Sequence, residues 1–189
     1  MLEIAPLSAV NFKDFVQLMG EKGGCGQCWC MNNRRTKADF ECGKVDGSNK
    51  KMLERMAVAG DNLGFLFYLE DEPVGWISVG PWQQFVRLEK SKTLRPFDAL
   101  PTWLITCFFV RKSERQQGYS KKMLAILLAF VADKFPEVPA LDAFPFNPQS
   151  KLPDPFVWGG VLSTFLDLGF QRQRGTSKSR IGVRFSLKR

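Results

Sequence analysis

One stretch limits the possible folds of this chain more than any other. Residues 102–135 join a nearly all-apolar segment, a short basic turn and a second apolar segment. Trp103 to Val110 is apolar at almost every position, which predicts a strand covered on both faces. Ser120 to Phe135 carries a wide apolar stripe at helical spacing, which predicts a helix packed on the sheet. The turn Arg111 to Tyr119 is therefore expected at the end of a central strand.

The turn has the composition of an anion-binding loop. Arg115-Gln116-Gln117-Gly118-Tyr119-Ser120 fits the pattern [Arg/Gln]-x-x-Gly-x-[Gly/Ala], with Ser in the last small position. A strand that ends in a glycine turn and opens a helix directs backbone N–H groups and the helix dipole at one point, which favours phosphate. Gly118 would allow close approach of the ligand, and Ser120 is expected to cap the helix. Five cations, opposed only by Glu114, match a diphosphate plus a ribose phosphate: Arg111, Lys112, Arg115, Lys121 and Lys122. A basic helix start that binds nothing is the alternative.

The remaining segments predict one α/β domain over residues 1–189. The expected elements are a strand at Leu2–Leu7, a helix with Phe12, Phe15, Val16 and Met19 on one face and capped by Ser8 or Asn11, a helical turn at Thr36–Phe40, a helix at Ser48–Ala59, a hairpin at 64–80 that turns at Glu70–Pro73, a short strand or helical piece at Phe85–Glu89, a strand at Ala140–Phe144, a Pro-rich loop at 145–155, a helix at Trp158–Leu168, and a hairpin formed by Phe170–Arg174 and Arg180–Leu187. In the last strand, Arg184 and Lys188 are expected to face water.

This order of elements, with the turn at 115–120, resembles the GNAT superfamily of N-acetyltransferases over residues 64–187. The resemblance implies an α/β (α+β) fold with a mixed, mostly antiparallel central sheet that is splayed at its middle strands and flanked by helices. It also implies acetyl-CoA as co-substrate, with its pyrophosphate in the turn and its pantetheine arm along the central strand. The cofactor-binding residues that it implies are Phe108, Phe109, Val110, Arg115, Gln116, Gln117, Gly118, Tyr119, Ser120 and Asn147.

The activity implied by the resemblance is transfer of an acetyl group to an amine of a small molecule or peptide. Phe165 stands where the family often has a Tyr that protonates the leaving thiolate, and the chain has no histidine to replace it. Glu89 and Asp142, acting directly or through a water, are the candidate bases, and a surface or structural role is the alternative for each. A GNAT-like module that binds acyl-CoA with weak or no catalysis is the alternative function.

The early cysteines allow a different class of protein. Cys25, Cys28, Cys30 and Cys42 have the spacing C-x2-C-x-C-x11-C, which allows a four-cysteine zinc site in a nucleic-acid binder. The segment lacks the second CxxC of a zinc ribbon, so reduced thiols that line a loop or pocket are favoured, and we expect no metal.

Charge is concentrated at one end of the sequence. The net charge is +8, and residues 171–189 hold seven basic side chains and no acidic one. Such an end favours an anionic ligand or is a solvated polar face, and nucleic acid is not expected as a partner. The sequence contains no run of about 18 apolar residues, so no membrane span is predicted, and the N-terminus lacks the basic region of a signal peptide. We therefore expect a cytoplasmic protein, with a homodimer left open.

Overall fold

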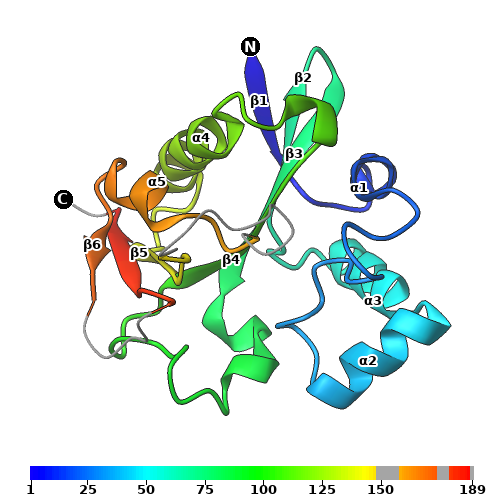
Figure 1. Cartoon of the computed structure of the whole chain (residues 1–189), viewed down its shortest axis with the longest axis horizontal. Helices are drawn as coiled ribbons and strands as arrows, with labels where there is room; N and C mark the ends of the chain where they lie inside the picture. The colour runs from blue at the N-terminus through cyan, green and yellow to red at the C-terminus, as the bar shows by residue number, and fades with distance from the viewer. Residues whose placement is uncertain (148–157, 174–178, 188–189) are drawn as a thin grey trace.

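The computed structural model describes residues 1–147, 158–173 and 179–187 (Figure 1). Most of the expected Pro-rich loop, Arg174 and Lys188 lie outside these residues. The elements, in chain order, are β1 (Leu2–Pro6), α1 (Phe12–Met19), α2 (Lys37–Asp46), α3 (Ser48–Val58), β2 (Phe65–Leu69), β3 (Glu72–Pro81), the 3-10 helices η1 (Trp82–Gln84) and η2 (Val86–Leu88), β4 (Trp103–Val110), the 3-10 helix η3 (Lys112–Glu114), α4 (Tyr119–Lys134), β5 (Ala140–Ala143), α5 (Leu162–Leu166), β6 (Gln171–Arg172) and β7 (Val183–Ser186).

The seven strands form one mixed sheet in the order β1-β2-β3-β4-β5-β7-β6. Every neighbouring pair is antiparallel except β4 and β5, which are parallel. The β5 strand pairs with β4 only over Trp103 to Ile105, whereas β4 runs on to Val110. The expected mixed, mostly antiparallel sheet is confirmed, and it opens at its middle strands.

Each face of the sheet has its own hydrophobic core. On one face, α4 and α5 pack on the strands through residues that include Met123, Leu127 and Phe165. On the other face, α1, α2 and α3 cover the sheet through residues that include Phe15 and Trp76 (Figure 1). The long apolar helix after the turn is thus α4, as predicted, and its buried stripe anchors the start of the helix against the sheet.

A bulge interrupts β4 where the sheet opens. Cys107 lies opposite Ser78 and Ile105 opposite Val79, so Thr106 is an extra residue in β4. The Thr106 hydroxyl donates to the Ser78 hydroxyl at 3.1 Å. Bulges redirect the side chains that follow them. Here the bulge lies just beyond Ile105, the last β4 residue paired with β5, so the residues that follow it line the opening.

Two helices differ in length from the predictions. The expected turn at Thr36–Phe40 is the first part of α2, whose N-cap Thr36 accepts a hydrogen bond from the Asp39 N–H. Its apolar pattern was too sparse to predict ten helical residues, because only Phe40 and Gly43 are buried in it. The helix expected at Trp158–Leu168 is shorter and begins only at Leu162 of α5, because Trp158 and Gly159 form a turn and Gly160 has a φ of 78°.

Three local expectations were wrong. Asn11 is the N-cap residue of α1, but its side chain accepts from the Ser8 N–H at 2.8 Å instead of capping the helix. The hairpin turns at Glu70 and Asp71, which both have positive φ, and the Pro that follows them belongs to β3. Arg184 is buried on β7 because two carboxylates bind it. No helix in the described part of the chain is both long and apolar enough to span a membrane.

Candidate functional site

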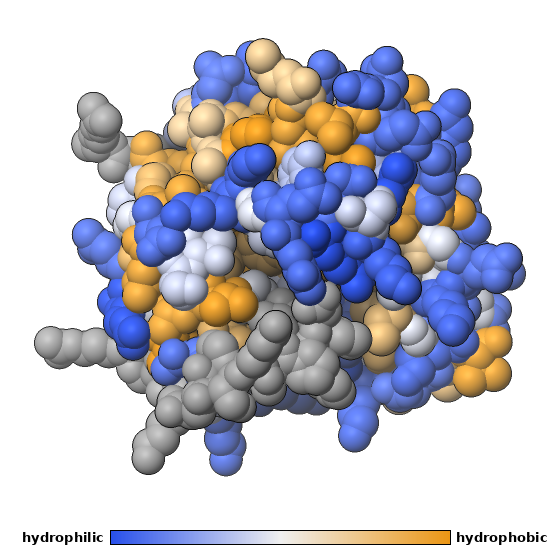
Figure 2. All heavy atoms as spheres, turned by 45° about the horizontal axis from the view of Figure 1, so that its top comes forward, coloured by the Kyte–Doolittle hydropathy of each residue, from blue (hydrophilic) through white to orange (hydrophobic). Residues whose placement is uncertain are grey.

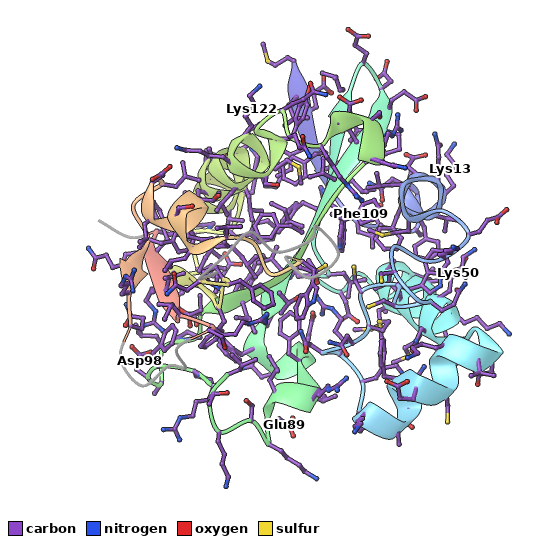
Figure 3. The ribbon with its side chains drawn as sticks, viewed as in Figure 1. Lys13, Lys50, Glu89, Asp98, Phe109 and Lys122 are labelled. Carbon is purple, nitrogen blue, oxygen red and sulfur yellow. The ribbon has the colours of Figure 1, made fainter. Side chains whose placement is uncertain are left out.

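A cavity of about 1030 Å³ lies between the turn before α4, the open edge of β4 and the loop that follows α1. Its turn end is lined by Glu114, Arg115, Gln116, Gly118, Tyr119 and Ser120. Its opposite end is lined by Gly23, Gly24, Cys25, Gly26, Cys28, Cys30, Asn32, Asn33, Phe40 and Lys44. Residues 106–110 of β4 run between the two ends, and Figure 3 shows Phe109 near the middle of the molecule, between α4 and α1. The cavity therefore joins the predicted anion site to the cysteine-rich loop.

The turn has the backbone geometry of an anion site. Gly118 is the N-cap of α4 with a φ of 76°, and a side chain at this position would meet no atom within 4 Å. The first helical hydrogen bonds run from the N–H groups of Lys121 and Lys122 to the Gly118 carbonyl. The N–H groups of Tyr119 and Ser120 precede these bonds, as at any helix start. Ser120 lies inside the helix and does not cap it, because Gly118 already begins the helix.

The charge around the turn is more balanced than predicted. Arg111 pairs with Glu72 at 3.0 Å, and Lys121 pairs with Asp167 at 2.7 Å, so Glu114 is not the only opposing carboxylate. The Arg115 Nε–H donates to the Val110 carbonyl at 3.0 Å, which holds this side chain beside the end of β4. Figure 2 shows hydrophilic residues across the middle of the face that is turned forward from the top of Figure 1.

The open edge of β4 is partly occupied. Phe108 and Val110 direct backbone groups away from β3: the Phe108 N–H binds the Trp158 carbonyl, and the Val110 carbonyl binds Arg115. By the alternation of an antiparallel pair, Phe109 directs its backbone groups to β3, where it lies opposite Trp76. Phe109 therefore offers the cavity its side chain rather than its backbone.

Eight of the ten predicted cofactor-binding residues line the cavity: Phe108, Phe109, Val110, Arg115, Gln116, Gly118, Tyr119 and Ser120. Gln117 does not line it, because its side chain donates back to the Ser113 carbonyl at 3.1 Å. Asn147 does not line it either, and its N–H donates to the Ser179 carbonyl at 3.0 Å.

Asp142 is a structural carboxylate. Its side chain is 0% exposed and accepts from Arg184 Nε at 2.6 Å and from the Thr102 hydroxyl at 2.7 Å. The Trp82 Nε1–H also donates to it at 3.2 Å, and Arg184 binds Asp98 on its other side. This carboxylate is saturated with donors and does not line the cavity, so the structure does not bring it to the reacting position.

Glu89 also lies away from the cavity. It follows η2, and its N–H donates to the Val86 carbonyl. Figure 3 shows Glu89 at the lower edge of the molecule, far from Phe109. Among the described lining residues Glu114 is the only carboxylate, and it belongs to the turn end. Neither Glu89 nor Asp142, the two candidate bases, lines the cavity.

Phe165 lines the cavity, so a hydroxyl is missing where the resemblance places a Tyr. Its ring packs edge-on against Phe108 with 5.7 Å between centroids, and the side chain is 0% exposed. Thr164, which precedes Phe165 on α5, lines the cavity as well.

The cysteines divide into two groups. Cys25, Cys28, Cys30 and Cys107 line the cavity, whereas Cys42 is exposed on α2. Burial, more than the neighbouring Cys30, raises the pKa of Cys28 to about 11. The described residues contain no group of three or more His, Cys, Asp or Glu that could hold a metal. Three of the early cysteines, Cys25, Cys28 and Cys30, thus line the cavity.

The cysteine-rich end also contains residues that sequence patterns did not indicate. Asn32, Asn33 and Lys44 line the cavity at this end. Lys44 pairs with Glu41 at 2.6 Å on the same helix. Trp29, from the same loop, does not line the cavity and is buried in the core beneath α1.

The mixed sheet opens at β4, and the glycine turn that begins α4 lies at one end of the cavity beside this opening. A family model described as Acetyltransferase (GNAT) family matches residues 29–151, and the chain therefore belongs to the GNAT family of acetyltransferases. This match confirms the resemblance noted in the sequence. A comparison with curated protein sequences gave no match.

Solved structures agree on the fold. The PaiA N-acetyltransferase from Thermoplasma acidophilum, in complex with coenzyme A, is 13% identical with a TM-score of 0.54, over 98% of this chain and 99% of that chain. The loading GNATL domain of CurA from Lyngbya majuscula is 14% identical with a TM-score of 0.53, over 99% and 98%. The AAC(6')-Ib structure with ribostamycin and coenzyme A is 14% identical with a TM-score of 0.58, over 98% and 93%. At these identities the likeness concerns the fold alone.

Proposed function

We propose that this chain is an N-acetyltransferase that moves an acetyl group from acetyl-CoA to an amine of a small molecule or peptide. The observation that carries the proposal is the single cavity that joins the turn before α4 to the open edge of β4. Membership of an acetyltransferase family supports acyl transfer. Two structural neighbours contain coenzyme A, which supports acetyl-CoA as the co-substrate.

The cofactor would bind with its pyrophosphate at the turn. The N–H groups of Tyr119 and Ser120, at the positive end of the α4 dipole, would donate to phosphate oxygens. Arg115 lies beside this point and would add a charge-assisted contact. The pantetheine arm would follow β4 and hydrogen-bond with the backbone of Val110. It would also take the place of the Trp158 carbonyl as the acceptor of the Phe108 N–H.

Positioning would supply most of the catalysis. The amine nitrogen would attack the thioester carbonyl, and an N–H group of β4 would stabilise the oxyanion. The C–N bond would form, the C–S bond would break, and coenzyme A would leave as a thiolate that takes the proton released by the nitrogen. A thiol with an ordinary pKa of about 8.5 leaves as a thiolate without a strong acid. The absence of a hydroxyl on Phe165 therefore slows the step without preventing it.

The acceptor would enter from the cysteine-rich end. Thiols, the amides of Asn32 and Asn33, and the ammonium of Lys44 surround that end. Because the only carboxylate among the described lining residues belongs to the turn, a polycationic acceptor would find little counter-charge. An amine whose other groups are neutral or anionic fits this wall better.

A second function has one observation in its favour. The apolar ring of Phe165 occupies the place of the expected acid, so a module that binds acyl-CoA with weak or no turnover is the competing proposal. The two proposals share the cofactor site and differ only in chemistry. An experiment must therefore measure binding and turnover separately.

Isothermal titration calorimetry with acetyl-CoA tests the shared site. The double variant Arg115→Glu, Gly118→Asp places two carboxylates at the expected pyrophosphate position and should weaken binding by at least roughly 100-fold. Lys13→Glu, on an exposed position of α1, is the matched charge reversal and should bind normally. Absence of heat with the native chain would refute both proposals.

Turnover is measured as release of coenzyme A with a panel of amines. Release that depends on an amine supports the transferase. Binding without amine-dependent release, across amino acids, peptides, polyamines and aryl amines, favours the binding module.

A further inference from the structure

Two polar side chains at the cysteine-rich end of the cavity can donate further hydrogen bonds. Lys44 of α2 and Asn32, from the loop between α1 and α2, both line the cavity. The Lys44 ammonium has more N–H donors than the one that Glu41 accepts at 2.6 Å. Glu41 is half-exposed and is not among the described lining residues, so water screens this pair. The ammonium therefore keeps donors for a ligand.

The orientation of the Asn32 amide follows from its partner. Arg87 Nη1 donates to the Asn32 side-chain oxygen and, at 3.3 Å, to the Asn32 backbone carbonyl. A guanidinium can only donate, so the amide oxygen faces Arg87 and the NH₂ group is directed away from it. The Arg87 N–H also donates to the Asn33 carbonyl at 3.2 Å. Asn32 is thus held through its side chain and its backbone, and no hydrogen bond within the described part of the chain uses its NH₂ group.

The charge at this end is positive. Lys44 Nζ and the Arg87 guanidinium lie over the ring of Phe40, which lines the cavity, at 5.5 and 5.9 Å from its centroid. Glu41 is the carboxylate that interacts with both cations, and Lys37 acts on the same carboxylate. One carboxylate cannot neutralise these cations, so an excess of positive charge remains beside the cavity. Such an excess favours an anionic group on a ligand.

We propose that Lys44 and Asn32 form a carboxylate subsite, so that the acceptor is an amine that also carries a carboxylate, as an amino acid does. This inference rests on the proposed acetyl transfer and names the class of its acceptor. One carboxylate oxygen accepts from Lys44 Nζ and the other from Asn32 Nδ2, while the amine of the same molecule lies toward the opening of β4, where Phe108 lines the cavity. Glu114, the carboxylate among the described lining residues, belongs to the opposite end and does not repel this group.

The subsite distinguishes a carboxylate from a carboxamide of the same shape. Lys44 and Asn32 Nδ2 both donate, and a carboxylate offers each of them an oxygen. A carboxamide has one oxygen and turns its own NH₂ group toward the second donor. Hydrogen bonds to a charged group are also the stronger ones. The exchange of carboxylate for carboxamide should therefore lower kcat/KM by at least about 10-fold.

The test compares amines in matched pairs. The common L-amino acids and the straight ω-amino acids up to 6-aminohexanoate are each offered with saturating acetyl-CoA, beside the corresponding carboxamide. Release of coenzyme A gives kcat/KM for both members of a pair, and their ratio is the carboxylate preference. We expect at least one pair with a preference of at least about 10-fold. The spacing of amine and carboxylate in the best substrate then measures the distance from the subsite to the thioester.

Two variants address the subsite itself. Lys44→Met removes the charge and keeps most of the side-chain length, and it should reduce the preference by at least about 10-fold, mainly through KM. Asn32→Asp replaces the amide donors by a carboxylate and should reduce the preference as well. Lys51→Met, at an exposed position of α3 away from the cavity, is the matched control and should keep the native preference. A preference compares two substrates on one protein, so partial loss of folded protein cancels.

The outcomes separate this subsite from the proposed function. Turnover of amines with no carboxylate preference, or a preference that Lys44→Met leaves unchanged, overturns the subsite and leaves the acetyltransferase standing. A preference that falls in Lys44→Met and not in Asn32→Asp overturns the part assigned to Asn32. No acetyl-CoA binding in calorimetry, or binding without release by any amine, overturns the transferase and the subsite with it. A preference that both variants reduce and Lys51→Met keeps supports the subsite.

Discussion

Removal of Asp142 should destabilise the fold far more than removal of the neighbouring carboxylate on the same arginine. Asp142 is fully buried, and Arg184, Thr102 and Trp82 all donate to it. Its truncation to Ala leaves these donors without their acceptor in the interior. Breaking one side of a buried ion pair costs about 3–5 kcal/mol, and we expect a loss of unfolding free energy in that range for Asp142→Ala.

Asp98→Ala is the matched control, since Asp98 pairs with the same guanidinium from a half-exposed position. Solvent screens such a pair, so its loss should cost about 0–1 kcal/mol. Urea unfolding followed by tryptophan fluorescence measures both values. Equal losses for the two variants, or less than about 1 kcal/mol for Asp142→Ala, would refute the reasoning. Acetyl-CoA binding by folded Asp142→Ala should match that of the native chain, because the carboxylate does not line the cavity.

Three further outcomes follow from local geometry. Gly80→Ala would place its Cβ 2.3 Å from the backbone carbonyl oxygen of Asn62, and overpacking of this kind should lower the unfolding free energy by about 1–3 kcal/mol in urea titrations; no loss would contradict the close packing. Thr36→Ala removes the N-cap bond to Asp39 and should cost about 0.5–2 kcal/mol, whereas Thr36→Ser should restore most of it. Burial raises the pKa of Cys28 to about 11, so iodoacetamide should alkylate Cys28 slowly near pH 9 and faster as the pH approaches that value. Because the folded chain keeps a proton that the unfolded thiol loses near pH 8.5, this group's contribution to stability is complete below that pH and is lost as the pH rises through about 11. Alkylation of Cys28 as fast as that of an unfolded-peptide thiol would contradict its burial.

The strand–turn–helix at 102–135 was predictable because its signals are local. An all-apolar strand, a glycine turn and an apolar helix each follow from neighbouring residues, and the observed β4 and α4 match them within one residue at each end. The family resemblance rested on the same local order.

Other features depend on contacts between distant segments. Arg184 alternates with apolar residues on β7, and this pattern predicts a solvent-facing side chain. The side chain is buried instead, because it binds Asp142 on β5 and Asp98. Nothing near Arg184 in the sequence specifies those partners. The cavity could not be predicted from local sequence either, since it combines Cys30 and Lys44 with Cys107, about 60 to 80 positions away along the chain. The spacing of the early cysteines did not reveal that the Cys30 sulfur accepts a hydrogen bond from Trp76 on β3.

The buried hydrophobic residues form three separate clusters, and the two largest lie on opposite faces of the sheet, which has a consequence for divergence and engineering. The core beneath α1, α2 and α3 carries the cysteine-rich end of the cavity, and the core beneath α4 carries the turn. Substitutions in two such cores share few partners, and their effects on stability should add. A library of variants confined to residues 20–46 could thus alter acceptor choice while the cofactor half keeps its own packing. If residues 20–46 bind the acceptor, as proposed, this end of the cavity can diverge in sequence without disturbing the packing around the turn.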